Sequence, residues 1–207
     1  APGLFGYAID IDDDLAVIGD PYSVVNQTGL QTGCFSLYAH DDESGAWEFA
    51  GLNPDFGFDS GASLGVSVAV QGADDNGTQA GRIVAGASGA NDSEGAVVVL
   101  GLDGSLHQID PPVPGLQTHF GRGVAILDDL LAIGELERDD GSPAHVHLYE
   151  YDDFSDQWVH LQSLPDPRPN TTGASDSAFG MQLELVRTPE GDAINLLVNA
   201  PNANDEF

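Results

Sequence analysis

The sequence contains no lysine, and its only basic residues are five arginines, set against 34 aspartates and glutamates. The formal net charge is −29. A field of this sign repels phosphate backbones and anionic lipid headgroups, so the composition argues against nucleic acid and membrane surfaces as partners. Cations, basic proteins and high-salt surroundings suit it better. A marine or halophilic environment would explain the acidity without any specific site, and a dedicated cation-binding role is the alternative.

Cysteine and long apolar runs are also scarce. Cys34 is the single cysteine, so no disulfide can form within the chain, and its apolar surroundings predict a buried, unreactive thiol. No run approaches the roughly 18 apolar residues of a membrane helix, so no membrane insertion is expected. The chain begins at Ala1 without a charged-then-apolar leader, a start that either a removed signal peptide or an internal fragment would produce. No helical period of apolar residues is visible either, which leaves an all-β fold.

A repeat of nearly 60 residues runs through the sequence. Each repeat opens with an aromatic residue or leucine followed by glycine. Alternating apolar and polar residues come next, as in a half-buried strand, and then an apolar run that ends in Gly or Asn. The four openings are Phe5-Gly6, Leu64-Gly65, Phe120-Gly121 and Phe179-Gly180. The second apolar runs are 15–21, 82–88, 130–136 and 195–201.

The first three repeats each continue with two more predicted strands. The third strands are 34–40, 96–102 and 144–151, and the weaker fourth strands are 46–52, 105–110 and 157–164. Short turns with Gly or Asp join them as hairpins, and Gly/Pro-rich connectors separate the repeats. The pattern therefore predicts four-stranded antiparallel units repeated around an axis, as in a β-propeller. A sandwich or an open stack of sheets are the alternatives, and the regular period disfavours the sandwich.

The order Phe-Gly, alternating strand, turn and apolar-Gly-Asp-Pro resembles the FG-GAP repeat, most clearly at 5–21 and 120–136. This resemblance implies a propeller like that at the head of integrin α chains, in the calcium-free bacterial form where a tight turn joins the first two strands. It covers nearly the whole chain, 1–207, as one propeller segment. The implied blades are 5–52, 64–110 and 120–164, followed by a half blade at 179–207. Leu64 and Ser88 depart from the pattern.

Three and a half blades are about half of the seven-bladed ring that the resemblance implies. The chain is then a fragment of a longer polypeptide, or two copies complete one ring, or copies exchange strands in a head-to-tail polymer. The implied function is a secreted or cell-surface binding and adhesion module, with a protein or glycan ligand or copies of itself as partners. A structural subunit of an extracellular filament or surface layer is the second hypothesis. A polysaccharide hydrolase or lyase is the third.

The repeated residues have a physical role in such an arrangement. Glycine at the strand opening lets neighbouring backbones approach closely, and the aromatic residue before it fills the wedge between adjacent sheets. Packing of this kind is the expected role of Phe5, Phe120 and Phe179. Trp47 and Trp158 hold equivalent places in two of the fourth strands, and they too are expected to pack between sheets.

Calcium is the cofactor that the resemblance suggests, because many FG-GAP turns carry Asp-x-Asp-x-Asp-Gly-x-x-Asp. The candidate ligands are Asp10, Asp12 and Asp14 in the first repeat and Asp74 and Asp75 in the second. Neither turn holds the whole motif. The first is short and lacks the glycine, and the second lacks the closing acid. Solvated turns are the alternative interpretation.

Other candidate sites are weaker. His145 and His147 alternate on one predicted strand but have no third ligand nearby, so histidines on the surface or on the face of a strand are expected instead of a zinc site. No nucleophile elbow, phosphate-binding glycine loop or Cys–His arrangement is present, so no enzyme is expected. Sequons in predicted loops permit N-glycosylation. They are Asn26, Asn76, Asn91 and Asn170.

The charge leads to a first prediction. The melting temperature should rise as NaCl is raised from about 10 mM to about 0.5 M, because salt screens the repulsion among the carboxylates. Thermal melts followed by circular dichroism measure this, and a melting temperature independent of NaCl would contradict it. Melts at equal concentrations of calcium chloride and magnesium chloride separate screening from a specific site. Screening raises the melting temperature equally in both salts, whereas a specific calcium site makes the rise larger in calcium chloride.

Overall fold

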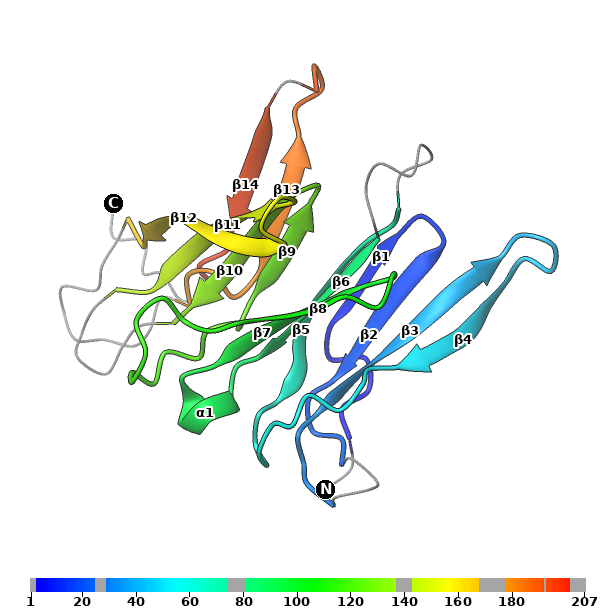
Figure 1. Ribbon diagram of the computed structural model, residues 1–207, viewed down its shortest axis with the longest axis horizontal. Helices are drawn as coiled ribbons and strands as arrows, with labels where there is room; N and C mark the ends of the chain where they lie inside the picture. The colour runs from blue at the N-terminus through cyan, green and yellow to red at the C-terminus, as the bar shows by residue number, and fades with distance from the viewer. Residues whose placement is uncertain are drawn as a thin grey trace.

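The computed structural model describes residues 3–24, 29–73, 81–136, 143–167, 178–191 and 193–201. These residues form four antiparallel sheets in chain order (Figure 1). Sheet 1 comprises β1 (Ile9–Asp12), β2 (Leu15–Asp20), β3 (Cys34–Asp41) and β4 (Ala46–Leu52). Sheet 2 comprises β5 (Leu64–Gln71), β6 (Arg82–Ala87), β7 (Ala96–Gly101) and β8 (Leu106–Ile109). Sheet 3 comprises β9 (Val124–Leu127), β10 (Leu130–Glu135), β11 (His145–Asp152) and β12 (Gln157–Pro165), and sheet 4 comprises β13 (Leu183–Arg187) and β14 (Ile194–Val198).

The all-β prediction is confirmed, and the strands group as three four-stranded sheets and one two-stranded sheet among the described residues. The single helical element in this part of the chain, α1 (Ala90–Ser93), is one turn in which Asn91 and Asp92 have left-handed backbone angles. The first strands of sheets 1, 3 and 4 begin later than the alternation predicts. Gly6 explains the delay in sheet 1: it has φ +89°, and the next amide bonds back to Leu4, which closes a turn before β1 begins.

Each four-stranded sheet is a meander, so its strands turn at two opposite ends. The turns between strands one and two and between strands three and four lie at the same end, which we call the hairpin end. The connectors from one sheet to the next begin and end at the other, the connector end. In Figure 1 the hairpin tips lie toward the top and right of the view, and α1 and the connector after β4 lie along the bottom.

The sheets stack face to face, and an apolar core fills each of the three interfaces. Val17 and Phe35 of sheet 1 pack against Ala85 and Val98 of sheet 2. The second core lies between sheets 2 and 3, and the third between sheets 3 and 4. Successive side chains of a strand point to opposite faces, and both faces of sheets 2 and 3 are covered by a neighbouring sheet. The strands β5 and β6 are therefore buried along their whole length.

Glycine allows this stacking, and one of its close contacts recurs in all three interfaces. An ideal Cβ added to Gly19 would lie 2.0 Å from the carbonyl oxygen of Gly65, the opening glycine of the next sheet. The same construction at Gly86 gives 1.9 Å to the oxygen of Gly121. At Gly134 the distance to the Gly180 oxygen is 2.1 Å. A side chain at the end of the second strand would therefore force the sheets apart.

The aromatic residues at the repeat openings do not all behave as predicted. Phe120 is fully buried between sheets 2 and 3, and Phe179 is buried between sheets 3 and 4. Phe5 is 57% exposed, so the predicted packing role is wrong for this residue within the described chain. Trp47 is also exposed, whereas Trp158 packs against the core between sheets 2 and 3. Cys34 is half-buried, and burial raises the pKa of its thiol.

The glycine contact gives the second prediction. Replacing Gly86 by Ala should lower the free energy of unfolding by about 3 kcal/mol, because the added methyl group meets the Gly121 carbonyl group, which is backbone, as well as the Ser67 hydroxyl. The matched control is Gly51→Ala, since a Cβ there meets nothing within 4 Å and the backbone is not left-handed. Urea unfolding measures both variants. Equal losses would show that the close approach does not limit stability.

Candidate functional site

The hairpin ends of the four sheets point the same way. The amides of Val70 and Gly72 donate to side chains of β1, which shows that β1 and β5 run parallel. Arg82 at the start of β6 reaches the β9–β10 turn, and Arg187 at the end of β13 reaches the same turn. The hairpin ends of successive sheets therefore form one continuous surface.

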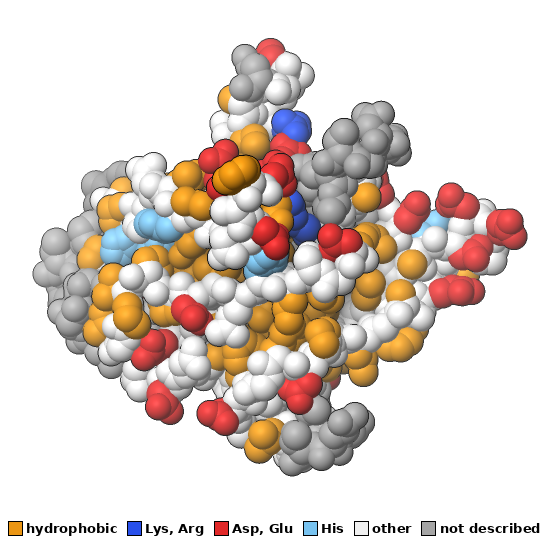
Figure 2. All heavy atoms as spheres, in the orientation of Figure 1, with side chains coloured by type: hydrophobic (Ala, Val, Ile, Leu, Met, Phe, Trp, Pro, Cys, Tyr) orange, Lys and Arg blue, Asp and Glu red, His pale blue; other side chains and the backbone are white. Residues whose placement is uncertain are grey.

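This surface is acidic. Figure 2 shows the crowding of carboxylates at the tip of the β3–β4 hairpin, at the right of the view. Of the basic residues that the structure describes, Arg82 and Arg187 lie at this end. The acidic residues of the described hairpin turns are Asp12, Asp13, Asp14, Asp41, Asp42, Glu43, Asp103, Asp128, Asp129, Asp152, Asp153, Asp156 and Glu190, all at least partly exposed.

Three of these aspartates hold the turns in shape. Asp41, Asp103 and Asp152 stand at equivalent places in the turns between the third and fourth strands. Each accepts hydrogen bonds from the turn that follows, as Asp41 does from the amide of Ser44 at 2.7 Å. Hydrogen bonds from the following serine lower the pKa of all three carboxyls. These hydrogen bonds therefore favour the charged form of the three side chains.

Arg82 joins sheet 2 to sheet 3 at the hairpin end. Its Nη1 donates to the Asp128 carbonyl oxygen at 3.1 Å and to Asp129 Oδ1 at 2.9 Å. Its guanidinium carbon lies 4.3 Å from the centre of the Tyr151 ring and 5.4 Å from that of Trp158. Sequence reasoning missed this contact because it joins residues of two different repeats.

The predicted calcium ligands are not brought together. Asp10 Oδ2 accepts from the Val70 amide at 2.8 Å, and Asp12 Oδ2 accepts from the Gly72 amide at 2.7 Å. Both carboxylates thus accept hydrogen bonds from backbone amides along the inner edge of β5. Burial raises the pKa of Asp10. Asp74 and Asp75 lie outside the described residues.

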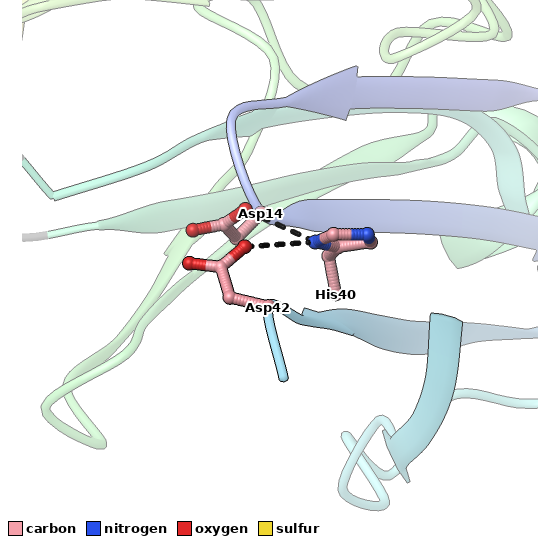
Figure 3. A group of neighbouring side chains, drawn as sticks. All are labelled: Asp14, His40 and Asp42. Atoms are coloured by element: carbon pink, nitrogen blue, oxygen red, sulfur yellow. Dashed lines mark hydrogen bonds and ion pairs between the residues drawn. The ribbon is translucent and has the colours of Figure 1, made fainter. Parts of the chain in front are cut away.

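Asp14, the third predicted ligand in the first repeat, lies near His40 and Asp42 (Figure 3). His40 Nδ1 is 3.2 Å from Asp42 Oδ1 and 3.6 Å from Asp14 Oδ1. Calcium takes six to eight oxygen ligands, and two carboxylates beside an imidazole fall short of that. Within the described ranges no other group of three potential metal-binding side chains is found.

A cavity of about 1050 Å³ lies along the first strands of all four sheets, β1, β5, β9 and β13. Arg122 Nη2 donates to the Tyr7 hydroxyl across it at 3.3 Å, so this contact links sheet 3 to sheet 1. Gln71 also lines the cavity, and both polar atoms of its buried side chain have no hydrogen-bond partner among the described residues. The cavity is thus polar as well as shared by every repeat.

Sheet 3 contains a buried hydrogen-bond relay that the sequence did not predict. His147 Nε2 lies 2.7 Å from Glu135 Oε2, and His147 Nδ1 lies 2.8 Å from Ser163 Oγ. His160 Nε2 contacts the same hydroxyl at 3.1 Å. Glu135 and His147 are almost completely buried. His147 lies on a face of β11, as expected, but that face belongs to the core and not to the surface. Partial burial lowers the pKa of His160, and the nearby His147 lowers it further.

The predicted sequons fall mostly outside the described residues. Asn91 is exposed in α1 at the connector end, and Asn26, Asn76 and Asn170 lie outside the described ranges. No helix in the described part of the chain has the length and apolar character needed to cross a membrane. A scan against models of protein families finds no match to this chain, and a search of curated proteins finds no similar sequence.

The relay yields the third prediction. Glu135→Ala should lower the free energy of unfolding by about 3 kcal/mol, because it leaves the buried His147 nitrogen without its carboxylate. Ser163→Ala, at the partly exposed end of the relay, should cost about 1 kcal/mol. Urea denaturation of the two variants tests this difference. A Glu135→Ala variant as stable as Ser163→Ala would show that the buried pair contributes no more to stability than the hydrogen bond at the exposed end of the relay.

Proposed function

We propose that the chain is a segment of an FG-GAP-type β-propeller and that it serves as an extracellular binding module. The contact surface is the acidic hairpin end, and the partner is a protein that presents a cluster of basic side chains. The observation that carries the proposal is the alignment of the hairpin turns of all four sheets into one surface of exposed carboxylates.

The arrangement of the sheets supports the propeller. They follow one another in chain order, each packed on the next, and their first strands are neighbours around one cavity. The fourth strands, β4, β8 and β12, form the opposite edge of each sheet. This is the order of strands expected when blades surround an axis.

The hairpin end suits binding because its described turns are held by hydrogen bonds and ion pairs and carry many charges. The turns are held by aspartate side chains bonded to the following amides, and the turn of sheet 3 is bonded to the sheets on both sides by Arg82 and Arg187. A single exposed ion pair contributes little, but many carboxylates on one surface attract and orient a basic partner. The extracellular setting follows from the resemblance in sequence.

The fourth prediction tests the surface. An oligo-arginine peptide should bind the chain, and binding should weaken as NaCl rises, because charge drives it. Changing Asp42, Asp153 and Asp156 to Asn should weaken binding by about tenfold. Isothermal titration calorimetry measures both effects.

The matched control removes three charges from the connector end, with Asp55, Asp59 and Asp92 changed to Asn. It keeps the net charge of the first variant, so it separates the surface from the overall field. Equal weakening by both variants would show that binding is non-specific and would overturn the proposal.

A further inference from the structure

The outer face of sheet 1 is apolar and uncovered in the described chain. Ile9, Ile11, Ile18, Tyr38 and Phe49 share this face. The strand register pairs Ile9 with Ile18, and a second row joins Ile11 through Ala16 to Tyr38 and Phe49. Ile9, Ile11 and Phe49 are each 58% exposed. Soluble proteins rarely leave so many large apolar side chains together on one surface, so this face is expected to have a partner.

Sheet 3 shows what covers the same face elsewhere in the molecule. Its residues at the equivalent register positions pack on sheet 2 and are buried. The equivalent pairs, with the exposed fraction in sheet 1 and then in sheet 3, are Phe5 and Phe120 (57% and 0%), Ile9 and Val124 (58% and 6%), and Ile11 and Ile126 (58% and 9%). The face that is open in sheet 1 is therefore one that a preceding four-stranded sheet covers in sheet 3.

The glycines repeat the same relation. Gly6, Gly65, Gly121 and Gly180 all have φ between +81° and +89°, so the four repeat openings have one conformation. The last three lie against the sheet before them, whereas a Cβ at Gly6 would meet nothing within 4 Å. Sheet 1 is thus preorganised for a neighbour whose second strand ends in glycine.

A second feature of the face points to arginine. In sheet 3, Tyr151 stands opposite Trp158 with ring centres 5.3 Å apart, and Arg82 of sheet 2 lies over both rings and bonds to Asp129. In sheet 1 the equivalent pair is His40 and Trp47, also with ring centres 5.3 Å apart.

The acidic turn beside this ring pair is also repeated. Asp14 follows Asp13 in the β1–β2 turn as Asp129 follows Asp128 in the β9–β10 turn, and Asp13 and Asp128 share a left-handed backbone. In the interface between sheets 2 and 3 the guanidinium of Arg82 lies beside such a ring pair and such a turn. On sheet 1, Asp14 and Asp42 flank the equivalent position beside His40 and Trp47. Carboxylates beside aromatic rings are favourable surroundings for arginine.

We propose that the outer face of sheet 1 binds a four-stranded sheet of the same repeat type, with arginine at the start of its second strand and glycine at the end. The arginine lies over His40 and Trp47 and pairs with Asp14 and Asp42. The glycine, which has no side chain, leaves room for the carbonyl oxygen of Gly6. The group of Asp14, His40 and Asp42 is then a site for a guanidinium and not for a metal ion.

The requirement for arginine and glycine in the partner's second strand excludes the chain's own fourth sheet as the partner. Its second strand, β14, has Asn195 where sheet 2 has Arg82, and Asn199 where sheet 2 has Gly86. Asn199 is at the glycine position because its carbonyl accepts from the opening glycine Gly180 at 2.9 Å, as that of Gly134 does from Gly121. Its side chain donates to Gln182 Oε1 at 2.8 Å. Head-to-tail polymerisation through this contact is therefore blocked.

The experiment supplies a sheet that can cover the outer face of sheet 1. A copy of residues 64–119 replaces residues 1–4 of the full chain, so that Phe5 follows the copy as Phe120 follows the original segment. Acrylamide quenching of Trp47 fluorescence, in a Trp158→Phe background, should fall to about half that of the unfused chain, because the copied sheet buries the ring. The control fusion carries Arg82→Asn and Gly86→Asn in the copy, the two residues of β14, and should leave Trp47 as accessible as in the unfused chain.

Failure of the first fusion to shield Trp47 overturns the proposal, and so does equal shielding by the control fusion. A second measurement needs no fusion. The chain should sediment as a monomer, and the Asn195→Arg, Asn199→Gly variant should associate with itself. Wild-type association that Phe5→Asp abolishes would show that copies dock without the arginine and the glycine, which would also overturn it. None of these results depends on the basic partner proposed for the hairpin end.

Discussion

The close approach of one backbone to the next, at glycines in each interface, is the constraint on which the whole architecture depends. Where Gly19, Gly86 and Gly134 end their strands, the carbonyl of the following sheet takes the space of a side chain. That contact fixes the distance between sheets, and the distance decides which side chains fill the gap. Aliphatic side chains then bury both faces of sheets 2 and 3.

Charge is the opposing influence. Carboxylates are placed where water reaches them, in the hairpin turns, or where another group bonds to them, as backbone amides do at Asp10 and Asp12 and as His147 does at the buried Glu135. The hydrogen bonds that lower the pKa of Asp41, Asp103 and Asp152 favour the charged state in the folded chain. The stability they contribute is present above the pKa of an unfolded aspartate and is lost as the pH falls through the lower folded pKa. An acidic surface and an ordered turn are thus compatible.

Local patterns predicted the strands well and the contacts between repeats poorly. Alternation and turn residues located every strand of the described chain to within a few residues, because a strand's period and its breakers are local. The partners of Arg82 could not be predicted, since Asp129, Tyr151 and Trp158 belong to another sheet. The burial of His147 was missed for the same reason, and so was the exposure of Phe5, whose pattern matches that of the buried Phe120.

Sheet 4 differs from the others in having only two described strands, and like sheet 1 it has one covered face. In a linear stack each sheet gains stability from its neighbours, and a unit at the edge gains from one neighbour alone. Sheet 4 also exposes Leu197 and Val186 on its free side. Opening fluctuations should therefore begin there and spread inward, so that amide exchange is fastest in β13 and β14 and slowest in the doubly covered β5 and β6.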